Sequence, residues 1–362
     1  MTNLSDNEIT QRYLTACATH IQWLIDEVRI ENNQLLINGW AIVTEGEPNN
    51  ARFLINGKAF DQVDYAMPSP DLKEIFWNIP AAQNARFVCK TAIDENTFSD
   101  GFACLEFLQN NNTQLARQTA WYWPNPNHNL PTPEEARIRR VIGAPDSTSY
   151  LIGGAAIFKR FEHYLEQKFS RPFSDFKSIL DWGCGSGRVS RHFHVVPDSE
   201  IWGVDIDKDN ISWCQTHLPH GKFSDIPLTP PTPLPDDYFD LIIGISVLTH
   251  LNEENQFAWL QELKRIAKKG ATLMLSIQGL SQTGLYRPPP AILREVEEKG
   301  FLITGRNSDL DDVMADNTHY INVIQSRDYI HKQWGKYFTI LDIVDAMAAN
   351  QDVVVMRNDK TS

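Results

Sequence analysis

The stretch Asp181-Trp182-Gly183-Cys184-Gly185-Ser186-Gly187 constrains the fold of this chain more than any other part of it. It follows the apolar pair Ile179-Leu180, which we expect to end a strand, and Arg188–His194 is expected to open a helix behind it. Glycine adopts backbone conformations that other residues avoid, so three glycines allow a tight turn and a close approach to a ligand. In a parallel sheet, a ligand at such a turn lies in the crevice at the carboxyl ends of the strands.

The spacing of the glycines indicates which ligand suits the turn. A dinucleotide-binding loop needs G-x-G-x-x-G. Counted from Gly183 the last position of that motif is Arg188, and counted from Gly185 it is Ser190, so the spacing fails twice. The pattern present is D-x-G-x-G-x-G, with Asp181 ahead of the glycines. A carboxylate there would repel a diphosphate and attract the ammonium group of an amino acid.

Two further acids lie where the next strands are expected to end. Asp205 comes 18 residues after Gly187, and its carboxylate can accept hydrogen bonds from the two hydroxyls of a ribose. Asp225 can accept a bond from the exocyclic amine of adenine, with Ile226 against the ring. Ammonium, ribose and adenine together describe S-adenosyl-L-methionine, which we predict as the cofactor. The predicted cofactor-binding residues are Asp181, Gly183, Cys184, Gly185, Gly187, Asp205, Ile206, Asp225, Ile226 and Ser246.

Strand-like and helix-like segments alternate after Pro131. The expected strands are Ser178–Trp182, Ile201–Ile206, Tyr238–Ile245, Ala271–Ile277, Tyr337–Ile343 and Asp352–Met356. The expected helices include Ile152–Phe169, Glu254–Lys268 and Ala291–Lys299, with Gly270 and Gly300 as helix stops. Such alternation predicts an α/β fold with a mostly parallel sheet that is covered by helices on both faces.

Residues 178–278 resemble a class I S-adenosylmethionine-dependent methyltransferase. The resemblance rests on the glycine turn, on Gly203-Val204-Asp205-Ile206-Asp207, on Phe239–Leu251 and on Trp259–Gly270. At Lys269-Gly270 the family often has Pro-Gly, a departure that concerns a helix stop and not the site. The resemblance covers about residues 136–357. It implies methyl transfer and a Rossmann-like sheet of seven strands with one reversed strand at its edge.

The N-terminal third has a different pattern. Asn7–Trp23 has apolar residues at helical spacing, which indicates a helix that packs on the protein or forms a dimer. Short β-like runs follow up to Trp123, and Asn56-Gly57 between two of them is typical of a type I′ hairpin. We predict a small antiparallel β-sandwich, in which Gly39-Trp40-Ala41 starts a strand and Trp40 lies in the core.

Prolines and asparagines between Pro124 and Pro131 indicate a linker. Beyond it, Thr132 is expected to cap a helix, with Pro133 at its first position and Glu135 completing a capping box. The predicted domains are therefore an N-terminal helix at 1–24, a β-sandwich at 25–123, a linker at 124–133 and a methyltransferase domain at 134–362.

Methyl transfer from a sulfonium is an in-line displacement in which the protein mainly supplies alignment. A hydroxyl or ammonium acceptor must lose a proton, so a general base is useful. His250 follows the expected strand Tyr238–Ile245, and His319 lies in the long connection Gly279–Lys336, which we expect to form part of a substrate cover. Both are candidate catalytic residues, and for His250 a purely local hydrogen-bonding role stays open. Tyr286 and Arg287 are interpreted as loop anchors.

Composition narrows the partners. The net charge of −13 disfavours nucleic acid, because phosphate contacts need clustered Lys and Arg. Five scattered cysteines indicate a reduced, cytoplasmic setting, and no apolar run is long enough for membrane insertion. His192 and His194 stand two apart, which is not the spacing of a helical metal pair, and Asp309, Asp311 and Asp312 lack the order of a calcium loop, so we predict no metal.

The function that follows is O-methylation of a small-molecule or glycan acceptor, ahead of N-methylation. The glycan hypothesis rests on the N-terminal β-region, which resembles β-domains beside bacterial polysaccharide-modifying enzymes, an analogy of fold that says little about chemistry. The alternative is a glycan- or protein-binding module with a catalytically silent methyltransferase fold. A homodimer through the N-terminal helix stays open.

Overall fold

The computed structural model describes residues 5–18, 23–43, 50–76, 79–109, 120–306 and 320–359. The chain divides into two compact units, each discontinuous in sequence. Unit 1 comprises Met1–Cys17, Leu130–Pro145 and Phe161–Ser362, and unit 2 comprises Ala18–Asn129 and Asp146–Arg160. The domains predicted from the sequence were each a single continuous segment, whereas both units combine separate segments. The predicted domain boundaries therefore stay a prediction.

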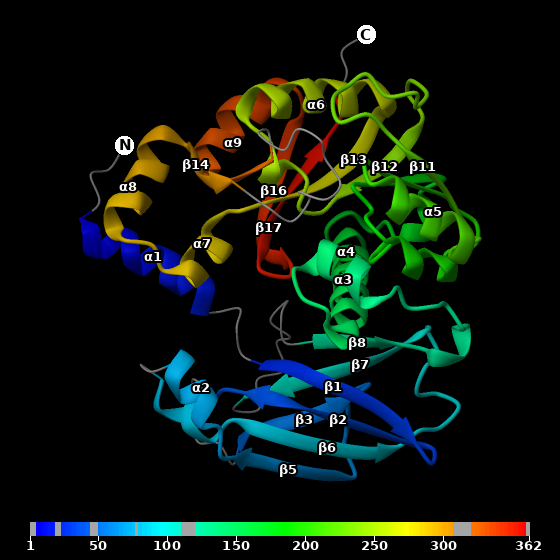
Figure 1. Cartoon of the computed structure of the whole chain (residues 1–362), viewed down its shortest axis with the longest axis vertical. Coiled ribbons are helices and arrows are strands. Elements are labelled where there is room, and N and C mark those ends of the chain that lie inside the picture. The colour runs from blue at the N-terminus through cyan, green and yellow to red at the C-terminus, as the bar shows by residue number, and fades with distance from the viewer. Residues whose placement is uncertain are drawn as a thin grey trace. The chain divides into compact units, whose positions relative to one another are not determined.

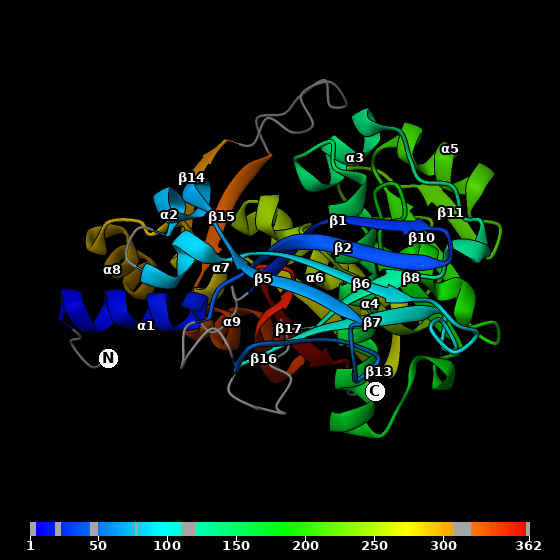
Figure 2. The same ribbon diagram turned by 90° about the horizontal axis from the view of Figure 1, so that it is seen from below.

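Unit 2 contains two four-stranded antiparallel sheets, in line with the predicted β-sandwich (Figures 1 and 2). One sheet has the order β1-β2-β6-β5, with strands β1 Trp23–Glu31, β2 Gln34–Ala41, β6 Arg86–Ala92 and β5 Gln62–Met67. The other has the order β4-β3-β7-β8, with strands β4 Lys58–Ala59, β3 Arg52–Ile55, β7 Phe102–Leu108 and β8 Ala120–Pro124. The short helix α2 Pro70–Ile75 and the 3-10 helix η2 Pro80–Asn84 lie between β5 and β6, and the 3-10 helix η3 Pro126–His128 follows β8.

Aromatic side chains from both sheets fill the core of unit 2. Trp23, Phe53, Phe87 and Phe107 are buried together, and the ring centroids of Phe53 and Phe87 are 4.7 Å apart. Trp23 begins strand β1, so the predicted helix Asn7–Trp23 is too long at its end. The observed helix α1 is Asp6–Ala18, because the indole of Trp23 is taken up by the sandwich core.

Two local predictions for unit 2, a hairpin turn and a strand start, can be compared with the structure. Asn56 and Gly57 both have positive φ, 49° and 75°, and join β3 to β4 with Ile55 opposite Lys58, which confirms the predicted hairpin. Gly39 and Trp40, predicted to start a strand, lie near the end of β2. Trp40 is buried as predicted, and its ring lies 5.4 Å from that of Phe76.

The main sheet of unit 1 has seven strands in the order β11-β10-β9-β12-β13-β17-β16 (Figure 1). The strands are β9 Ser178–Trp182, β10 Glu200–Asp205, β11 Gly221–Asp225, β12 Phe239–Gly244, β13 Ala267–Ile277, β16 Thr339–Ala348 and β17 Gln351–Arg357. Strand β17 is antiparallel to both neighbours, β13 and β16, and the other pairs are parallel. The reversed strand is therefore second from the edge, which corrects the expectation that it forms the edge.

Helices surround this sheet in unit 1. They are α1, α3 Glu135–Ile142, the C-terminal half of α4 Ser147–Phe169, α5 Lys208–His217, α6 Glu253–Ile266, α7 Leu280–Tyr286, α8 Pro290–Lys299 and α9 Arg327–Gln333. The 3-10 helices are η4 Phe173–Asp175, η5 Ser190–Val195, η6 Leu248–His250 and η7 Trp334–Lys336, and β14 Phe301–Arg306 pairs with β15 Ile321–Gln325. None of the helices in the described part of the chain is long and apolar enough to cross a bilayer.

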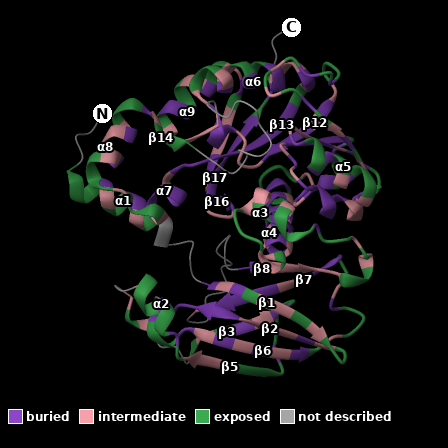
Figure 3. Cartoon of the chain, in the orientation of Figure 1, coloured by how far each residue is buried: buried purple, intermediate pink, exposed green. Residues whose placement is uncertain are grey.

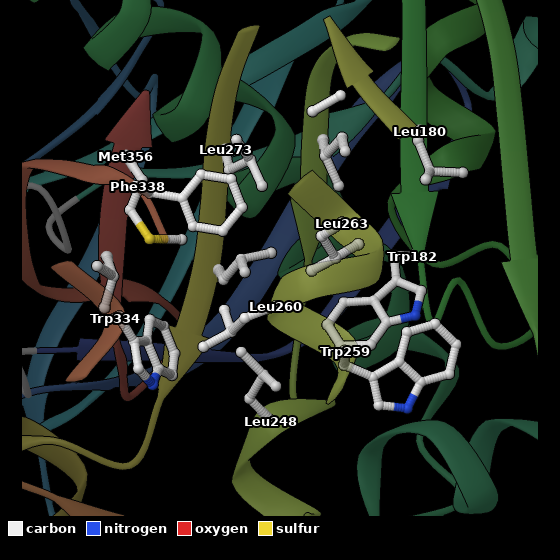
Figure 4. Packing of buried hydrophobic residues seen from close by; sticks show 14 of the residues in the cluster. Leu180, Trp182, Leu248, Trp259, Leu260, Leu263, Leu273, Trp334, Phe338 and Met356 are labelled. Atoms are coloured by element: carbon white, nitrogen blue, oxygen red, sulfur yellow. The ribbon is translucent and has the colours of Figure 1, made fainter. Parts of the chain in front are cut away.

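A large apolar cluster joins α6 and α9 to the sheet (Figure 4). In it Trp182 of β9 faces Trp259 of α6, with ring centroids 5.0 Å apart, so Trp182 lies in the core. Figure 3 shows that strands β12, β13 and β17 are largely buried and that the outer side of α8 is exposed. Full burial of one such side chain stabilises the fold by roughly 1.5–3 kcal/mol. This packing holds in place the strands that carry the site.

Three helix boundaries predicted from the sequence can be compared with the structure, and two of them are wrong. Helix α3 starts at Glu135 after the N-cap residue Glu134, which caps with no side-chain bond, so Thr132 is not its cap. Gly270, predicted as a helix stop, lies inside β13 with φ of +81°, where the register with β12 shifts. Gly270 thus lies at a bulge in β13 and is not the end of α6, which already ends at Ile266. Gly300 does end α8, in the left-handed conformation that was expected.

Helix α1 is covered inside unit 1. Its Ile9 and Tyr13 are buried against Leu293 of α8, with Leu280 of α7 packed beside them. The hydroxyl of Tyr13 donates to Glu297 at 2.9 Å. The apolar side of α1 is therefore used for packing within its own unit, the first of the two roles expected for it.

Candidate functional site

The site lies at the carboxyl edge of the main sheet. Strands β9, β10, β12 and β13 are parallel, so their carboxyl ends share one edge. Strand β17 is reversed, with Asp352 opposite Ile277, so its amino end reaches the same edge. Residues just before or at the start of β17 therefore meet residues that follow the other strands.

The glycine turn follows β9 as predicted. Gly183, Gly185 and Gly187 have φ of +75°, +56° and +78°, the left-handed region that favours glycine. The amides of Gly183 and Cys184 both donate to the carbonyl of Val204 on β10, at 2.8 and 3.0 Å. These bonds tie the turn to the next strand.

Protein side chains occupy the space beside these glycines. A Cβ on Gly183 would lie 2.2 Å from Val247, and one on Gly187 would lie 2.4 Å from Leu218. A Cβ on Gly185 would lie 3.0 Å from Val141 of α3. The missing side chains thus permit close packing of the protein around the turn, a role that the sequence did not indicate.

A 3-10 helix follows the turn instead of the predicted helix Arg188–His194. This helix, η5, begins at Ser190, and its residues turn inward to make tertiary bonds. The hydroxyl of Ser190 donates to Asp181 at 2.5 Å, and the guanidinium of Arg191 donates to the carbonyls of Leu130 and Pro131 at 2.9 Å each. These contacts are incompatible with a regular amphipathic helix, whose polar side chains face solvent.

Asp181 is the last acid before the turn and is 2 % exposed. Burial raises the pKa of its carboxyl to about 6, and the bond from Ser190 opposes that shift only in part. The charge of Asp205 adds to the increase, so the two predicted carboxylates interact. Asp181 can therefore hold a cation when it is ionised, and a cation would in turn favour its ionised form.

Asp205 ends β10 and is held by backbone amides. Its Oδ2 accepts from Gly185 at 2.7 Å and its Oδ1 accepts from Asp207 at 2.9 Å. Burial raises the pKa of this carboxyl, while those two bonds lower it. Each carboxylate oxygen can accept a further bond, so the pair can still receive two hydroxyl donors.

The other predicted cofactor contacts near these strands have different surroundings. Asp225 is exposed at the end of β11, with its carboxylate 3.7 Å from the ammonium of Lys208. Ile226 is buried in the main core cluster, and its amide donates to the carbonyl of Asp205. Ile206 is partly buried against the same cluster. Cys184, predicted as a cofactor-binding residue, is buried with Cys214 and packs beside the turn, and burial raises the pKa of its thiol.

Ser246 follows β12 with φ of +61°, a strained conformation for a residue with a side chain. Its amide donates to Ser276 Oγ at 2.7 Å, and its Oγ accepts from Gln351 Nε2 at 3.0 Å. His250 Nε2 lies 3.3 Å from Ser246 Oγ, and His250 Nδ1 lies 3.1 Å from the carbonyl oxygen of Ile321. The structure thus brings the predicted base His250 and the predicted cofactor residue Ser246 into one network.

His250 is 8 % exposed, and its ring lies 4.6 Å from that of Tyr320. His319, the second candidate base, lies outside the described residues, as do Asp309, Asp311 and Asp312. Tyr286 is 65 % exposed at the end of α7, and Arg287 caps that helix in the left-handed conformation, which fits a loop anchor.

Two histidines that were set aside as packing or surface residues lie in η5. His192 is buried, and His194 Nδ1 lies 2.7 Å from the carbonyl oxygen of Arg191. Within the described ranges no group of three or more His, Cys, Asp or Glu side chains could hold a metal ion.

Residue-by-residue reading of the sequence missed Gln351, Ser276 and Ser190. Ser190 and Ser276 carry a weak signal, because each is a polar residue close to the expected carboxyl end of a strand. Gln351 carries none unless β17 is already known to be reversed, since only then does its first residue lie at the carboxyl edge.

Comparison with known proteins bears on the strands that carry this site. Residues 180–275, from within β9 to within β13, match the family model described as a methyltransferase domain. Ajmaline N-methyltransferase from Rauvolfia serpentina is 28 % identical over 144 residues, which are 36 % of this chain and 47 % of that protein. The chain thus spans about half the length of this curated relative.

Solved structures are also similar to this chain, and several of them are described as S-adenosylmethionine-dependent methyltransferases. One from Methanosarcina mazei is 19 % identical, with a TM-score of 0.37, and covers 50 % of this chain and 91 % of its own. The PH0226 protein from Pyrococcus horikoshii OT3 is 16 % identical, with a TM-score of 0.41, and covers 61 % of this chain and 97 % of its own.

Proposed function

Because this chain contains a class I S-adenosylmethionine-dependent methyltransferase domain, we propose that it transfers a methyl group from S-adenosylmethionine to a small-molecule or glycan acceptor, preferentially to oxygen. The observation that supports this most is the pair Asp181 and Asp205, two interacting carboxylates on either side of a glycine turn at the carboxyl edge of the sheet. One suits an ammonium group and the other a pair of vicinal hydroxyls.

In this proposal the cofactor supplies a methyl group on a sulfonium centre. Asp181 binds the amino-acid ammonium, and Asp205 accepts from the ribose hydroxyls. Asp225 has an exposed carboxylate that is available to the adenine amine, and Ile226 and Ile206 supply apolar surface near it. The backbone of the turn Gly183–Gly187 follows the cofactor, with Cys184 filling the space beneath it.

His250 is the proposed general base. The carbonyl of Ile321 can only accept, so it favours a proton on His250 Nδ1 and leaves Nε2 able to take a proton from an acceptor hydroxyl. A hydroxyl acceptor benefits from such a base, whereas a carboxylate or thiolate acceptor needs none. This is why we favour O-methylation of an alcohol or phenol.

The second candidate function is a glycan- or protein-binding module with a silent methyltransferase fold. Unit 2 is a β-sandwich with its own aromatic core, which is compatible with a binding role. Against silence stand the intact carboxylates Asp181 and Asp205 and the network around His250, because these groups lie together at the carboxyl edge of the sheet.

Calorimetric titration with S-adenosylmethionine separates the two functions. We expect saturable binding by the full chain, and absence of binding would exclude the enzyme. A screen of metabolite and oligosaccharide fractions with methyl-labelled cofactor then identifies the acceptor. Label that is released by mild base would indicate an ester, stable label an ether or amine, and label found only on nitrogen would overturn the preference for oxygen.

A further inference from the structure

Four uncharged polar side chains lie in one hydrogen-bonded network with His250 at the carboxyl edge of the sheet. Ser276 lies near the end of β13 and is 1 % exposed, and Gln351 starts β17 and is 8 % exposed. Ser246 follows β12, and Thr249 lies beside His250 in η6. None of these residues is needed for the main core cluster, which contains only apolar side chains.

The donors and acceptors in this network have a fixed direction. Ser276 Oγ accepts the amide of Ser246, so its own hydroxyl proton is available to Gln351 Oε1, which lies at 2.6 Å. An amide oxygen can only accept, so the amide nitrogen of Gln351 faces the other way and donates to Ser246 Oγ at 3.0 Å. The orientation of the Gln351 amide is thus set by its neighbours.

Ser246 transmits this direction to His250. Since Ser246 Oγ already accepts from Gln351, its hydroxyl proton is directed toward His250 Nε2 at 3.3 Å or Thr249 Oγ1 at 3.2 Å. On the far side of the ring, the carbonyl of Ile321 requires a donor and so receives the Nδ1 proton. With Ser246 donating to His250, these two bonds fit the neutral tautomer with the proton on Nδ1 and a lone pair on Nε2.

We infer that Gln351 is a positioning residue for the methyl-transfer reaction: through Ser246 it keeps His250 in the Nδ1-protonated, neutral form in which Nε2 can accept a proton. The inference rests on the proposed function. It also gives Ser246 a different role from the cofactor contact expected for it. When Nε2 gains a proton, Ser246 can turn its hydroxyl to Thr249 and accept from His250, so the network serves both states of the base.

Replacing the amide with a carboxylate reverses this direction. In Gln351→Glu both oxygens of the introduced carboxylate can only accept, so Ser246 donates its hydroxyl proton to that carboxylate and presents a lone pair to His250 Nε2. With Nδ1 still bonded to Ile321, both ring nitrogens then act as donors and His250 becomes an imidazolium, which the new negative charge also favours. Gln351→Met removes the donor without adding charge.

The test uses nitrogen NMR of the histidine rings in the full chain, with His250→Gln to assign the His250 signals. We expect the Nδ1-protonated neutral pattern in the wild type at a mildly alkaline pH and the doubly protonated pattern in Gln351→Glu. The exposed Gln261→Glu on α6 adds the same charge and should leave the wild-type pattern unchanged. An Nε2-protonated wild type, or a His250 spectrum unaltered in Gln351→Glu, would overturn the inference.

Kinetics add a second readout. Gln351→Glu should lower kcat about 100-fold or more and Gln351→Met about tenfold, with KM for the cofactor unchanged in both, as expected of a group that acts on a general base. A kcat of Gln351→Glu equal to that of the wild type would overturn the positioning role. The NMR measurement needs neither cofactor nor acceptor, so failure of the proposed function, seen as no cofactor binding by the wild type, is distinguished from failure of this inference.

Discussion

The two halves of the site lie on one edge of one sheet and are built in opposite ways. The carboxylate half consists of Asp181, the glycine turn and Asp205, within 25 residues, and backbone amides and a single serine hold its acids. The half around His250 joins Ser246, Ser276 and Gln351, with Ser246 and Gln351 105 positions apart, mainly through side chains and with the backbone amide of Ser246 also taking part. The carboxylate half shows that one short segment of sequence can supply most of a ligand-binding site. The half around His250 shows that the proposed proton-transfer site combines side chains from several strands.

The difference matters for what a substitution does. Backbone donors survive most side-chain changes, so in the carboxylate half we expect cofactor affinity to depend chiefly on the two acids and on Ser190, which donates to Asp181. In the other half each side chain orients the next, so a change at one position alters groups that it does not touch.

The largest expected effect is on turnover. His250→Asn should reduce kcat by about 100- to 10,000-fold, the usual contribution of a general base, and leave cofactor affinity as it was. Steady-state kinetics with the acceptor found in the screen and calorimetry with the cofactor check the two halves separately. His163→Asn, on the exposed side of α4, serves as the control. A fall in cofactor affinity equal to the fall in kcat would break the comparison.

Removing the ribose acceptor comes next. Asp205→Ala should weaken binding of S-adenosylmethionine by about 100-fold or more, because two charge-assisted hydrogen bonds at roughly 1.5–3 kcal/mol each are lost. Calorimetry measures this directly. Asp209→Ala, whose side chain is 75 % exposed at the start of the next helix, should bind as the wild type does. Unchanged affinity in Asp205→Ala would refute the assigned ribose contact.

A smaller effect is expected where the two halves touch. Gly183→Ala should lower the free energy of unfolding of unit 1 by about 2–4 kcal/mol, since left-handed backbone costs roughly 1–2 kcal/mol and the clash with Val247 a similar amount. Denaturant unfolding measures it. Gly143→Ala has nearly the same φ with open space around the new Cβ, so it should show the backbone cost alone. Equal losses in both variants would show that the contact with Val247 contributes nothing.

The smallest expected effect is that of pH on cofactor affinity. Because the pKa of Asp181 is raised to about 6, cofactor affinity should fall as the pH drops below about 6, approaching tenfold per pH unit. Calorimetry from about pH 5 to about pH 8 brackets this pKa, and Asp181→Asn should bind weakly at every pH. A flat wild-type profile would contradict the ammonium contact.

Stability of the protein without cofactor changes in the other direction. A raised pKa means that the folded state holds a proton that the unfolded state releases, so this stabilisation is fully present below the ordinary aspartate pKa of about 4 and is lost as the pH rises through about 6. Buried Asp352, whose pKa is likewise raised to about 6, contributes with the same sign. Denaturant unfolding across this range should show the decline, and Asp181→Asn should reduce its slope.

Much of the fold follows from local pattern. Apolar runs at Ser178–Trp182 and Phe239–Gly244 are strands because both faces of a parallel sheet are buried, which favours apolar residues at successive positions. The Asn56-Gly57 hairpin and the Gly300 helix end follow because their positive φ suits those residues. Where the prediction failed, as at Trp23, Gly270 and Arg188–His194, a tertiary contact outweighed the local preference.

The sequence by itself was enough to predict the methyl donor and the edge of the sheet where we propose that it binds, because Asp181, the glycines and Asp205 lie close together in the chain and their spacing reflects their geometry. Only the tertiary structure decided what surrounds His250. The reversed direction of β17 carries Gln351 to the carboxyl edge, and strand direction is set by how the whole sheet pairs, not by any residue within the strand.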